Sequence, residues 1–202
     1  MKVLVAGGAG FIGSHLVDAL LKEGHEVVCV DNFFIGTKRN IEHLANEPMF
    51  HFYEQDICDL DAMDRIFAEE KVEYVFHLAA NSDIQASANN PVIEYKNTYT
   101  TTFNLIECMR RHNVKKLFFA STSAVYGEKM GTEVAETTTP LEPISYYGAA
   151  KLGSEALISA YSYMNDLSVL IFRFPNVIGP RLTHGVIFDF VERLKEDPSH
   201  LR

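Results

Sequence analysis

The chain has 202 residues, of which 47% are hydrophobic and 22% charged, a composition typical of a soluble globular protein with one core. Its formal net charge of −9 argues against nucleic acid as a partner, because phosphate backbones repel an acidic surface. No apolar run reaches the ~18–20 residues needed to span a membrane. Three widely spaced cysteines without a secretory signal indicate reduced thiols and a cytoplasmic protein.

Short apolar runs alternate with longer amphipathic stretches along the chain. The apolar runs predict six strands, at residues 2–7, 25–31, 49–56, 72–80, 114–123 and 167–175. The amphipathic stretches predict helices at residues 11–24, 38–46, 59–70, 91–113, 146–166 and 186–197. This alternation is typical of an α/β fold, a Rossmann-type doubly wound parallel sheet with helices on both faces. The long irregular stretch at residues 127–143 is a candidate loop over a site.

A glycine-rich turn joins the first predicted strand to the first predicted helix. Gly7, Gly10 and Gly13 form a G-x-x-G-x-x-G spacing within it. Glycines allow the backbone to approach a pyrophosphate closely, and the start of the helix offers unpaired N–H groups. The alternative interpretation is a tight structural turn, but the strand–turn–helix context favours a dinucleotide site.

Two carboxylates follow the second and third predicted strands. Asp31 stands eighteen residues after Gly13, where a carboxylate can accept hydrogen bonds from an adenosine ribose. It would repel a 2′-phosphate, so NAD is favoured over NADP, although Lys38 and Arg39 nearby weaken that preference. Asp56 is a candidate for binding the adenine edge, or a solvated turn residue.

The chain resembles the extended short-chain dehydrogenase/reductases, specifically the NAD-dependent sugar-nucleotide epimerases and dehydratases. The resemblance covers nearly the whole chain and depends on six motifs: "GGAGFIGSH" from Gly7, "DN" at Asp31, "HLAA" from His77, "STSAVYG" from Ser121, "YYGAAK" from Tyr146 and "RFPNVIGPR" from Arg173.

This resemblance implies roles for individual residues. The catalytic residues are Thr122, Tyr147 and Lys151, with Ser123 a close competitor of Thr122 for the catalytic hydroxyl, and Lys151 also binds the nicotinamide ribose. Ser123 and Asn176 are expected to bind substrate, and Tyr146 to pack or line the substrate site. The expected NAD-binding residues are Gly7, Gly10, Phe11, Ile12, Gly13, Asp31, Asn32, Asp56, Ile57, Leu78, Ala79, Ala80, Asn97, Tyr147 and Lys151.

The spacing of Tyr147 and Lys151 has a physical meaning of its own. Residues four apart share one face of a helix. A free tyrosine has a pKa near 10, and an ammonium about 5 Å away at an effective dielectric of about 20 contributes roughly 3 kcal/mol, or about two pKa units. The sequence therefore predicts a phenol that ionises near neutrality and acts as a base toward a sugar hydroxyl.

The residues after Thr122 favour one reaction within the family. Dehydratases of the family usually place Asp-Glu there and decarboxylases often keep the glutamate, whereas this chain has Ser123 and Ala124. Alanine cannot transfer protons. The leading hypothesis is therefore UDP-glucose 4-epimerase-like chemistry on a nucleotide-activated hexose. The alternatives are a dehydratase, a decarboxylase, a reductase using NADPH, or an NAD-binding module without turnover.

The resemblance also implies a domain organisation. Residues 1–175 are expected to form the NAD-binding domain, and residues 176–202 the start of a substrate-binding region whose remainder, the C-terminal substrate domain, is largely absent. A homodimer through the helices around residues 91–103 and 146–151 is expected from the family. No metal site is expected, since His77 has no partner ligands in the sequence and is better explained as a structural histidine.

Overall fold

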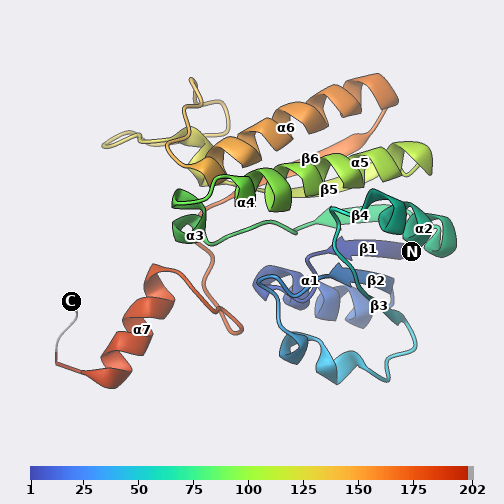
Figure 1. Ribbon diagram of the computed structural model, residues 1–202, viewed down its shortest axis with the longest axis horizontal. Helices are drawn as coiled ribbons and strands as arrows, with labels where there is room; N and C mark the ends of the chain where they lie inside the picture. Colours follow the sequence, from blue (N-terminus) through green and yellow to red (C-terminus); the bar gives the residue numbers. More distant parts are fainter. Residues whose placement is uncertain (200–202) are drawn as a thin grey trace.

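A computed structural model describes residues 1–199, in which six strands form one parallel sheet with the order β3-β2-β1-β4-β5-β6 (Figure 1). The six predicted strands and the doubly wound parallel sheet are therefore confirmed. The order reverses between β1 and β4, which opens a crevice at the carboxyl ends of these strands. The strands are β1 (Lys2–Ala6), β2 (Glu26–Asp31), β3 (Phe50–Glu54), β4 (Tyr74–His77), β5 (Lys116–Thr122) and β6 (Ser168–Phe174).

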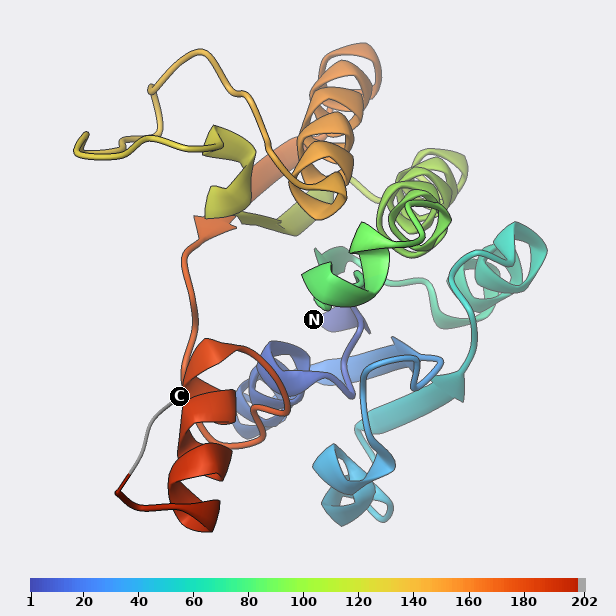
Figure 2. The ribbon, with the colours of Figure 1, turned by 60° about the vertical axis from the view of Figure 1, so that its left-hand side comes forward.

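Helices cover both faces of the sheet, as the sequence predicts. One face carries α2 (Leu60–Glu70), α5 (Thr101–Arg111) and α6 (Tyr146–Asn165), and the other carries α1 (Phe11–Lys22) (Figures 1 and 2). Strand β1 supplies both cores because alternate side chains point to opposite faces. Leu4 belongs to the core under α2, α5 and α6, while Val3 and Val5 belong to the core under α1.

Two predicted helices differ from the structure. Residues 38–46 form two short 3₁₀ helices, η1 (Lys38–Asn40) and η2 (Glu42–Leu44), because the buried Asn40 donates to the carbonyl of Ala9. Residues 91–113 are divided into α4 (Val92–Glu94), the π-helical η3 (Tyr95–Thr100) and α5. The α3 (Ile84–Ala88) and η4 (Ser123–Tyr126) segments were not predicted.

The π-helical turn of η3 coincides with threonine hydroxyls that bond to the backbone. Thr101 donates to the carbonyl of Asn97 at 3.1 Å, and Thr102 donates to that of Thr98 at 2.8 Å. Such back-bonding offers the carbonyls a second partner and distorts helices. The apolar periodicity of residues 91–113 does not reveal this change of helix type.

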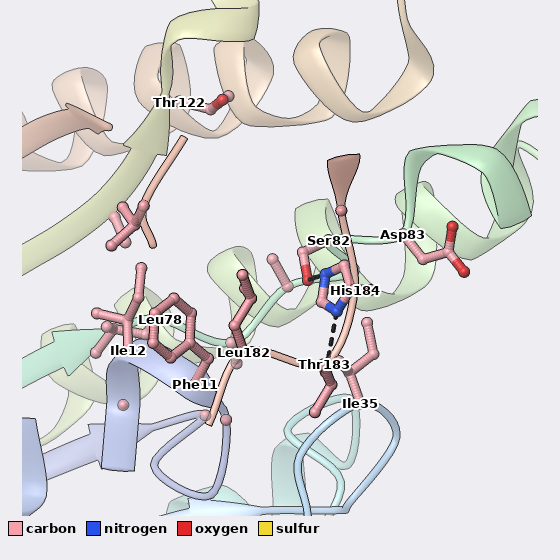
Figure 3. A pocket seen from close by; sticks show the side chains of 18 of the residues that line it. Phe11, Ile12, Ile35, Leu78, Ser82, Asp83, Thr122, Leu182, Thr183 and His184 are labelled. Atoms are coloured by element: carbon pink, nitrogen blue, oxygen red, sulfur yellow. Dashed lines mark hydrogen bonds between the residues drawn. The ribbon is translucent and has the colours of Figure 1, made fainter. Parts of the chain in front are cut away.

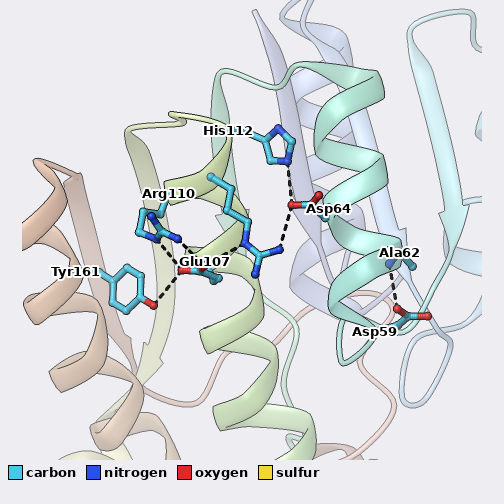
Figure 4. Close-up of polar contacts among 8 residues, drawn as sticks. Asp59, Ala62, Asp64, Glu107, Arg110, His112 and Tyr161 are labelled. Carbon is cyan, nitrogen blue, oxygen red and sulfur yellow. Dashed lines mark hydrogen bonds and ion pairs between the residues drawn. The ribbon is translucent and has the colours of Figure 1, made fainter.

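Polar contacts join the helices of the larger layer near the end of α5 (Figure 4). Glu107 accepts hydrogen bonds from Arg110, Arg111 and the hydroxyl of Tyr161 on α6. Hydrogen bonding from Arg110 is the largest cause that lowers the pKa of Glu107 to about 2. Asp64 on α2 forms an ion pair with Arg111 at 3.5 Å and a hydrogen bond with His112 at 3.1 Å, so the three helices are linked.

The last strand and the last helix are less covered than the rest. On the face of β5 and β6 away from α6, Phe118, Phe172 and Phe174 stack with ring centroids 5.0 to 6.4 Å apart, and Phe172 is 42% exposed. The predicted helix α7 (Val186–Glu196) lies apart from the sheet (Figure 2). Within residues 1–199, every helix lacks either the length or the apolar character that a membrane span requires.

Candidate functional site

A cavity of about 870 Å³ lies at the carboxyl ends of the strands, between the glycine turn and the start of α6 (Figure 3). Every residue that the sequence predicts as catalytic, NAD-binding or substrate-binding lines this cavity; the roles assigned to them stay predictions. They are Gly7, Gly10, Phe11, Ile12, Gly13, Asp31, Asn32, Asp56, Ile57, Leu78, Ala79, Ala80, Asn97, Thr122, Ser123, Tyr147, Lys151 and Asn176.

The glycine turn has no room for side chains. Gly7 has a φ of +80°, and a Cβ there would lie 2.7 Å from the backbone nitrogen of Ala79. A Cβ on Gly13 would lie 2.1 Å from the carbonyl oxygen of Gly7. The N-cap of α1 is Gly10, which supplies no side-chain cap, so the first N–H groups of the helix are left for another acceptor. This arrangement fits a pyrophosphate.

Asp31 is held by the backbone of two neighbouring loops. Its Oδ2 accepts the N–H of Ala9 at 2.9 Å, and its Oδ1 accepts that of Phe33 at 2.8 Å. Burial raises the pKa of Asp31, and these two hydrogen bonds oppose the rise. Each carboxylate oxygen has a further lone pair, so the residue can still accept hydrogen bonds from a ribose in the cavity.

The loop after β3 brings Asp56 and Ile57 to the cavity. Asp56 accepts the N–H of Cys58 at 2.9 Å and lies 3.5 Å from the ammonium of Lys96. The buried Asn104 donates to the carbonyl of Ile57 at 2.8 Å. Asn104 thus supports this loop from beneath.

Tyr147 and Lys151 lie in the first turns of α6, beside the end of β5. Lys151 is 2% exposed, and its Nζ donates to the carbonyl of Ala120 at 2.6 Å and lies 4.7 Å above the Phe119 ring. Burial lowers the pKa of Lys151 to about 7. Burial also raises the pKa of Tyr147 to about 12, partly opposed by a hydrogen bond with Thr122.

The pKa of Tyr147 therefore differs from the expectation that Lys151 lowers it by about two units. The expectation assumed a fixed ammonium in a medium of effective dielectric about 20. In the structure both groups are removed from water, which disfavours the charged form of each. Desolvation is the largest cause of the pKa shift of each group in the protein alone.

The two candidate hydroxyls differ in their surroundings. Thr122 is half-buried, and its hydroxyl accepts the N–H of Ala124 at 3.1 Å and interacts with Tyr147. Ser123 is exposed, although it also lines the cavity. The geometry favours Thr122 as the partner of the phenol. Tyr146, expected to pack or line the site, is 52% exposed and is not among the described residues that line the cavity.

Sequence analysis missed the other wall of the cavity. In Figure 3, His184 lies with its ring between Ser82 and Thr183, at 2.9 and 3.1 Å. Arg181 also lines the cavity and forms an ion pair with Asp18 of α1 at 2.8 Å. No periodic pattern in residues 177–185 signals these positions, because they belong to an irregular segment.

A second missed feature is a buried ion pair behind the end of β5. Arg173 donates to Glu155 at 2.8 Å and to the carbonyl of Glu136 in the 127–143 loop at 3.2 Å. Ser121 donates to the same Glu155 carboxylate. The pair joins β5, β6 and α6 to the loop, so it positions Thr122 indirectly.

The described residues contain one cluster with potential metal-binding groups. Glu26, His51 and Glu70 lie within 4.8 Å of one another, away from the cavity. The ammonium of Lys2 bridges the two carboxylates at 2.7 and 2.8 Å. His77 is fully buried and bonds to Thr102 at 2.9 Å, which agrees with a structural role.

Known proteins share this sequence and arrangement. The NAD dependent epimerase/dehydratase family matches residues 3–201. A UDP-glucose 4-epimerase of Lactobacillus helveticus is 37% identical over 179 residues, which cover 89% of this chain and 52% of that protein. Solved structures of UDP-glucose 4-epimerases from Thermotoga maritima, with UDP-glucose, and from Thermus thermophilus, with NAD, are each 38% identical; they match with TM-scores of 0.89 over 97% of this chain and 63% of theirs.

The chain is shorter than these proteins. It spans 64% or less of the length of the curated relatives that it matches.

Proposed function

Because this chain belongs to the NAD dependent epimerase/dehydratase family, we propose that it holds NAD at the glycine turn and epimerises C4 of a nucleotide-activated hexose, UDP-glucose or UDP-galactose. One observation carries the proposal. Thr122, Tyr147 and Lys151 converge on the same cavity as the glycine turn and Asp31. A dinucleotide site and an acid–base group at one cavity suit a redox step at a sugar hydroxyl.

The residues that would hold the cofactor are those of the crevice. The N–H groups at the start of α1 would bind the pyrophosphate, and Asp31 would accept from the adenosine ribose. Asp31 would also repel a 2′-phosphate, which favours NAD over NADP. Bound NAD would supply reversible hydride transfer at the sugar carbon, which is the redox chemistry that inversion at C4 requires.

The protein's own residues would transfer the proton. Tyr147 would take the proton of the 4-hydroxyl and later give it back, with Thr122 orienting the phenol through its hydroxyl. Lys151 would supply the positive charge that makes the phenolate accessible. Because the pKa of Tyr147 is about 12 in the protein alone, proton transfer needs Lys151 in its charged form.

Ala124 supports epimerisation over the other reactions of the family. Neither alanine nor the exposed Ser123 can supply the second acid that elimination of water requires. A 4-epimerase needs no second acid, because the same hydride and proton return to the substrate.

The proposal extends to the organisation of the protein. Residues 176–202, of which 200–202 lie outside the described residues, would begin a substrate-binding region next to an NAD-binding unit of residues 1–175; Asn176 at the cavity supports this division. A homodimer would form through residues 91–103 and 146–151, which carry the exposed Tyr95, Phe103 and Tyr146. The acidic surface and three free cysteines support a cytoplasmic location.

The test measures NAD binding and conversion of UDP-galactose to UDP-glucose side by side. Tyr147→Phe should reduce conversion by about 10²–10⁴-fold, because it removes the acid–base group, and should reduce NAD affinity far less, because it keeps the aromatic ring. Tyr146→Phe is the matched control and should retain conversion. If NAD binds and neither wild type nor control converts any UDP-sugar, the chain is an NAD-binding module without turnover.

A further inference from the structure

A buried acid lies on a helix that packs against the helix of the catalytic pair, and it has no part in the proposed reaction so far. Glu94, the last residue of α4, is 1% exposed. Its Oε1 accepts from the side-chain amide of Asn81 at 2.7 Å, and its Oε2 accepts from the hydroxyl of Thr98 at 2.8 Å. Both α4 and the following η3 pack against α6, the helix of Tyr147 and Lys151.

The hydrogen-bond network requires both oxygens of Glu94 to be acceptors. The amide of Asn81 also donates to the carbonyl of Asp83 at 2.9 Å, which fixes its NH₂ group as the donor to Glu94. The hydroxyl of Thr98 accepts the backbone N–H of Asn81 at 3.2 Å, so its own proton goes to Glu94. A group that only accepts at both oxygens is a carboxylate, not a protonated acid.

The hydrogen-bond partners of this carboxylate are neutral, which distinguishes it from the other acid near Lys151. Glu155 lies in a fork with Arg173 at 2.8 Å and accepts from Ser121 as well, so its charge is already matched. Both carboxylates raise the pKa of Lys151, and Glu94 contributes more. Its negative charge is therefore the one available to balance the buried ammonium.

The remaining groups around Lys151 supply no negative charge at neutral pH. His77 on β4 is fully buried, and burial holds its pKa well below the ordinary value, so it is neutral. Tyr147 is a neutral phenol with a pKa of about 12. Asp83, at the start of α3, is exposed to solvent, where its field is screened.

We propose that Glu94 is a positioning residue for the proposed reaction: its buried carboxylate is the counter-ion that keeps Lys151 protonated beside Tyr147. The inference rests on the proposed function for its catalytic meaning. Glu94 also acts directly on Tyr147, whose ionisation its charge opposes. Its benefit to the reaction must therefore come through Lys151, since loss of the ammonium would leave the phenol without any positive neighbour.

The test reads the charge of Lys151 itself. The protein is labelled at its lysine side chains, the Lys151 NMR signal is assigned by its loss in Lys151→Met, and the signal is followed from about pH 5 to about pH 10. Wild type should titrate near pH 7. Glu94→Gln, which keeps the shape but not the charge, should lower the midpoint by about one unit, a tenfold loss of proton affinity.

Two variants separate charge from packing. Thr98→Val removes one hydrogen bond to Glu94 but leaves its charge, so the midpoint should stay within about 0.3 unit of wild type. Glu107→Gln removes another nearly buried carboxylate of the same helical layer, one with its own arginines, and should also leave the midpoint unchanged. An unchanged midpoint in folded Glu94→Gln, or an equal fall in Thr98→Val, overturns the proposal.

Glu94→Asp carries the test if Glu94→Gln does not fold. Moving the charge by one methylene should lower the midpoint by a smaller amount, and no shift at all contradicts the proposal. These titrations need neither NAD nor sugar, so they can fail while the conversion assay succeeds, and the reverse. Where conversion is measurable, the alkaline limb of its pH profile should move to lower pH in Glu94→Gln by the same amount as the midpoint.

Discussion

The acid–base character of a buried residue depends on its neighbours more than on its spacing along the chain. The four-residue interval places Tyr147 and Lys151 on one face of α6, as expected. Their pKa values nevertheless move away from ionisation, to about 12 and about 7, because burial penalises charge at both. The protonation state of Lys151 then depends on residues distant in sequence, such as Glu94.

Glu70 shows the opposite balance at another buried position. It accepts hydrogen bonds from the ammonium of Lys2 at 2.8 Å, the hydroxyl of Tyr53 at 2.7 Å and the ring of His51 at 3.0 Å. Burial alone would raise the pKa of Glu70, but these three hydrogen bonds together lower it to about 2. The donors outweigh desolvation because they surround both carboxylate oxygens.

We predict that Glu70→Gln lowers the free energy of unfolding by about 2–3 kcal/mol at pH 7, since it leaves the ammonium of Lys2 and the other donors with a neutral partner. A carboxyl whose pKa falls on folding stabilises the fold above its unfolded value, 4.5, and loses that effect as pH falls toward about 2. The difference from wild type in urea unfolding should therefore shrink between about pH 5 and about pH 2. Glu69→Gln, at an exposed neighbour, is the control. If Glu70→Gln lost as much stability at about pH 2 as at pH 7, the explanation would be contradicted.

At the scale of elements, the turn between β1 and α1 is tightly constrained. A Cβ on Gly13 would lie 2.1 Å from the carbonyl oxygen of Gly7, which is backbone and cannot rotate away. Gly24 at the other end of α1 also has a positive φ, +78°, but a Cβ there would point into open space, with no atom beyond its chain neighbours within 4 Å. A side chain at Gly13 would therefore cause a steric clash, whereas a side chain at Gly24 would cause only backbone strain.

We predict that Gly13→Ala abolishes NAD binding and destabilises the fold by more than about 2 kcal/mol, because the turn must open. Gly24→Ala should cost about 1 kcal/mol from its left-handed backbone alone and should keep NAD affinity. Calorimetric titration with NAD and thermal unfolding measure both. Equal effects of the two substitutions would show that the turn does not depend on close packing.

At the scale of the whole molecule, the two faces of the sheet are unequally covered. Helices α2, α5 and α6 cover one face, while on the other face α1 packs on β1 and β2 and the aromatic row of β5 and β6 stays partly exposed. Apolar surface of this kind favours association and dye binding.

We predict that Phe172→Thr reduces the fluorescence of an apolar dye bound to the folded protein and raises its solubility, because it removes the most exposed ring of that row. Tyr163→Thr, at an exposed aromatic of α6, is the matched control and should leave dye fluorescence unchanged. If dye fluorescence fell equally in both variants, the dye would not bind at the aromatic row of β5 and β6.

The sequence by itself determined the sheet, its strands and the residues around the cavity. Continuous apolar runs have few alternatives to buried parallel strands, and a glycine turn or a Tyr–Lys interval is local, so its geometry follows from nearby residues. The other predicted site residues, up to Asn176, follow from the family motifs that the chain resembles.

Only the tertiary structure decided the helix types, the pKa values of Tyr147 and Lys151, and the residues of the far wall of the cavity. The π-helical turn at Tyr95–Thr100 and the two short 3₁₀ helices coincide with side-chain hydrogen bonds that periodicity does not record. The pKa values of Tyr147 and Lys151 depend on burial, and the place of Glu94 beside them depends on how α4 packs against α6. Desolvation and long-range contacts are properties of the assembled fold, so the spacing of residues along the chain cannot reveal them.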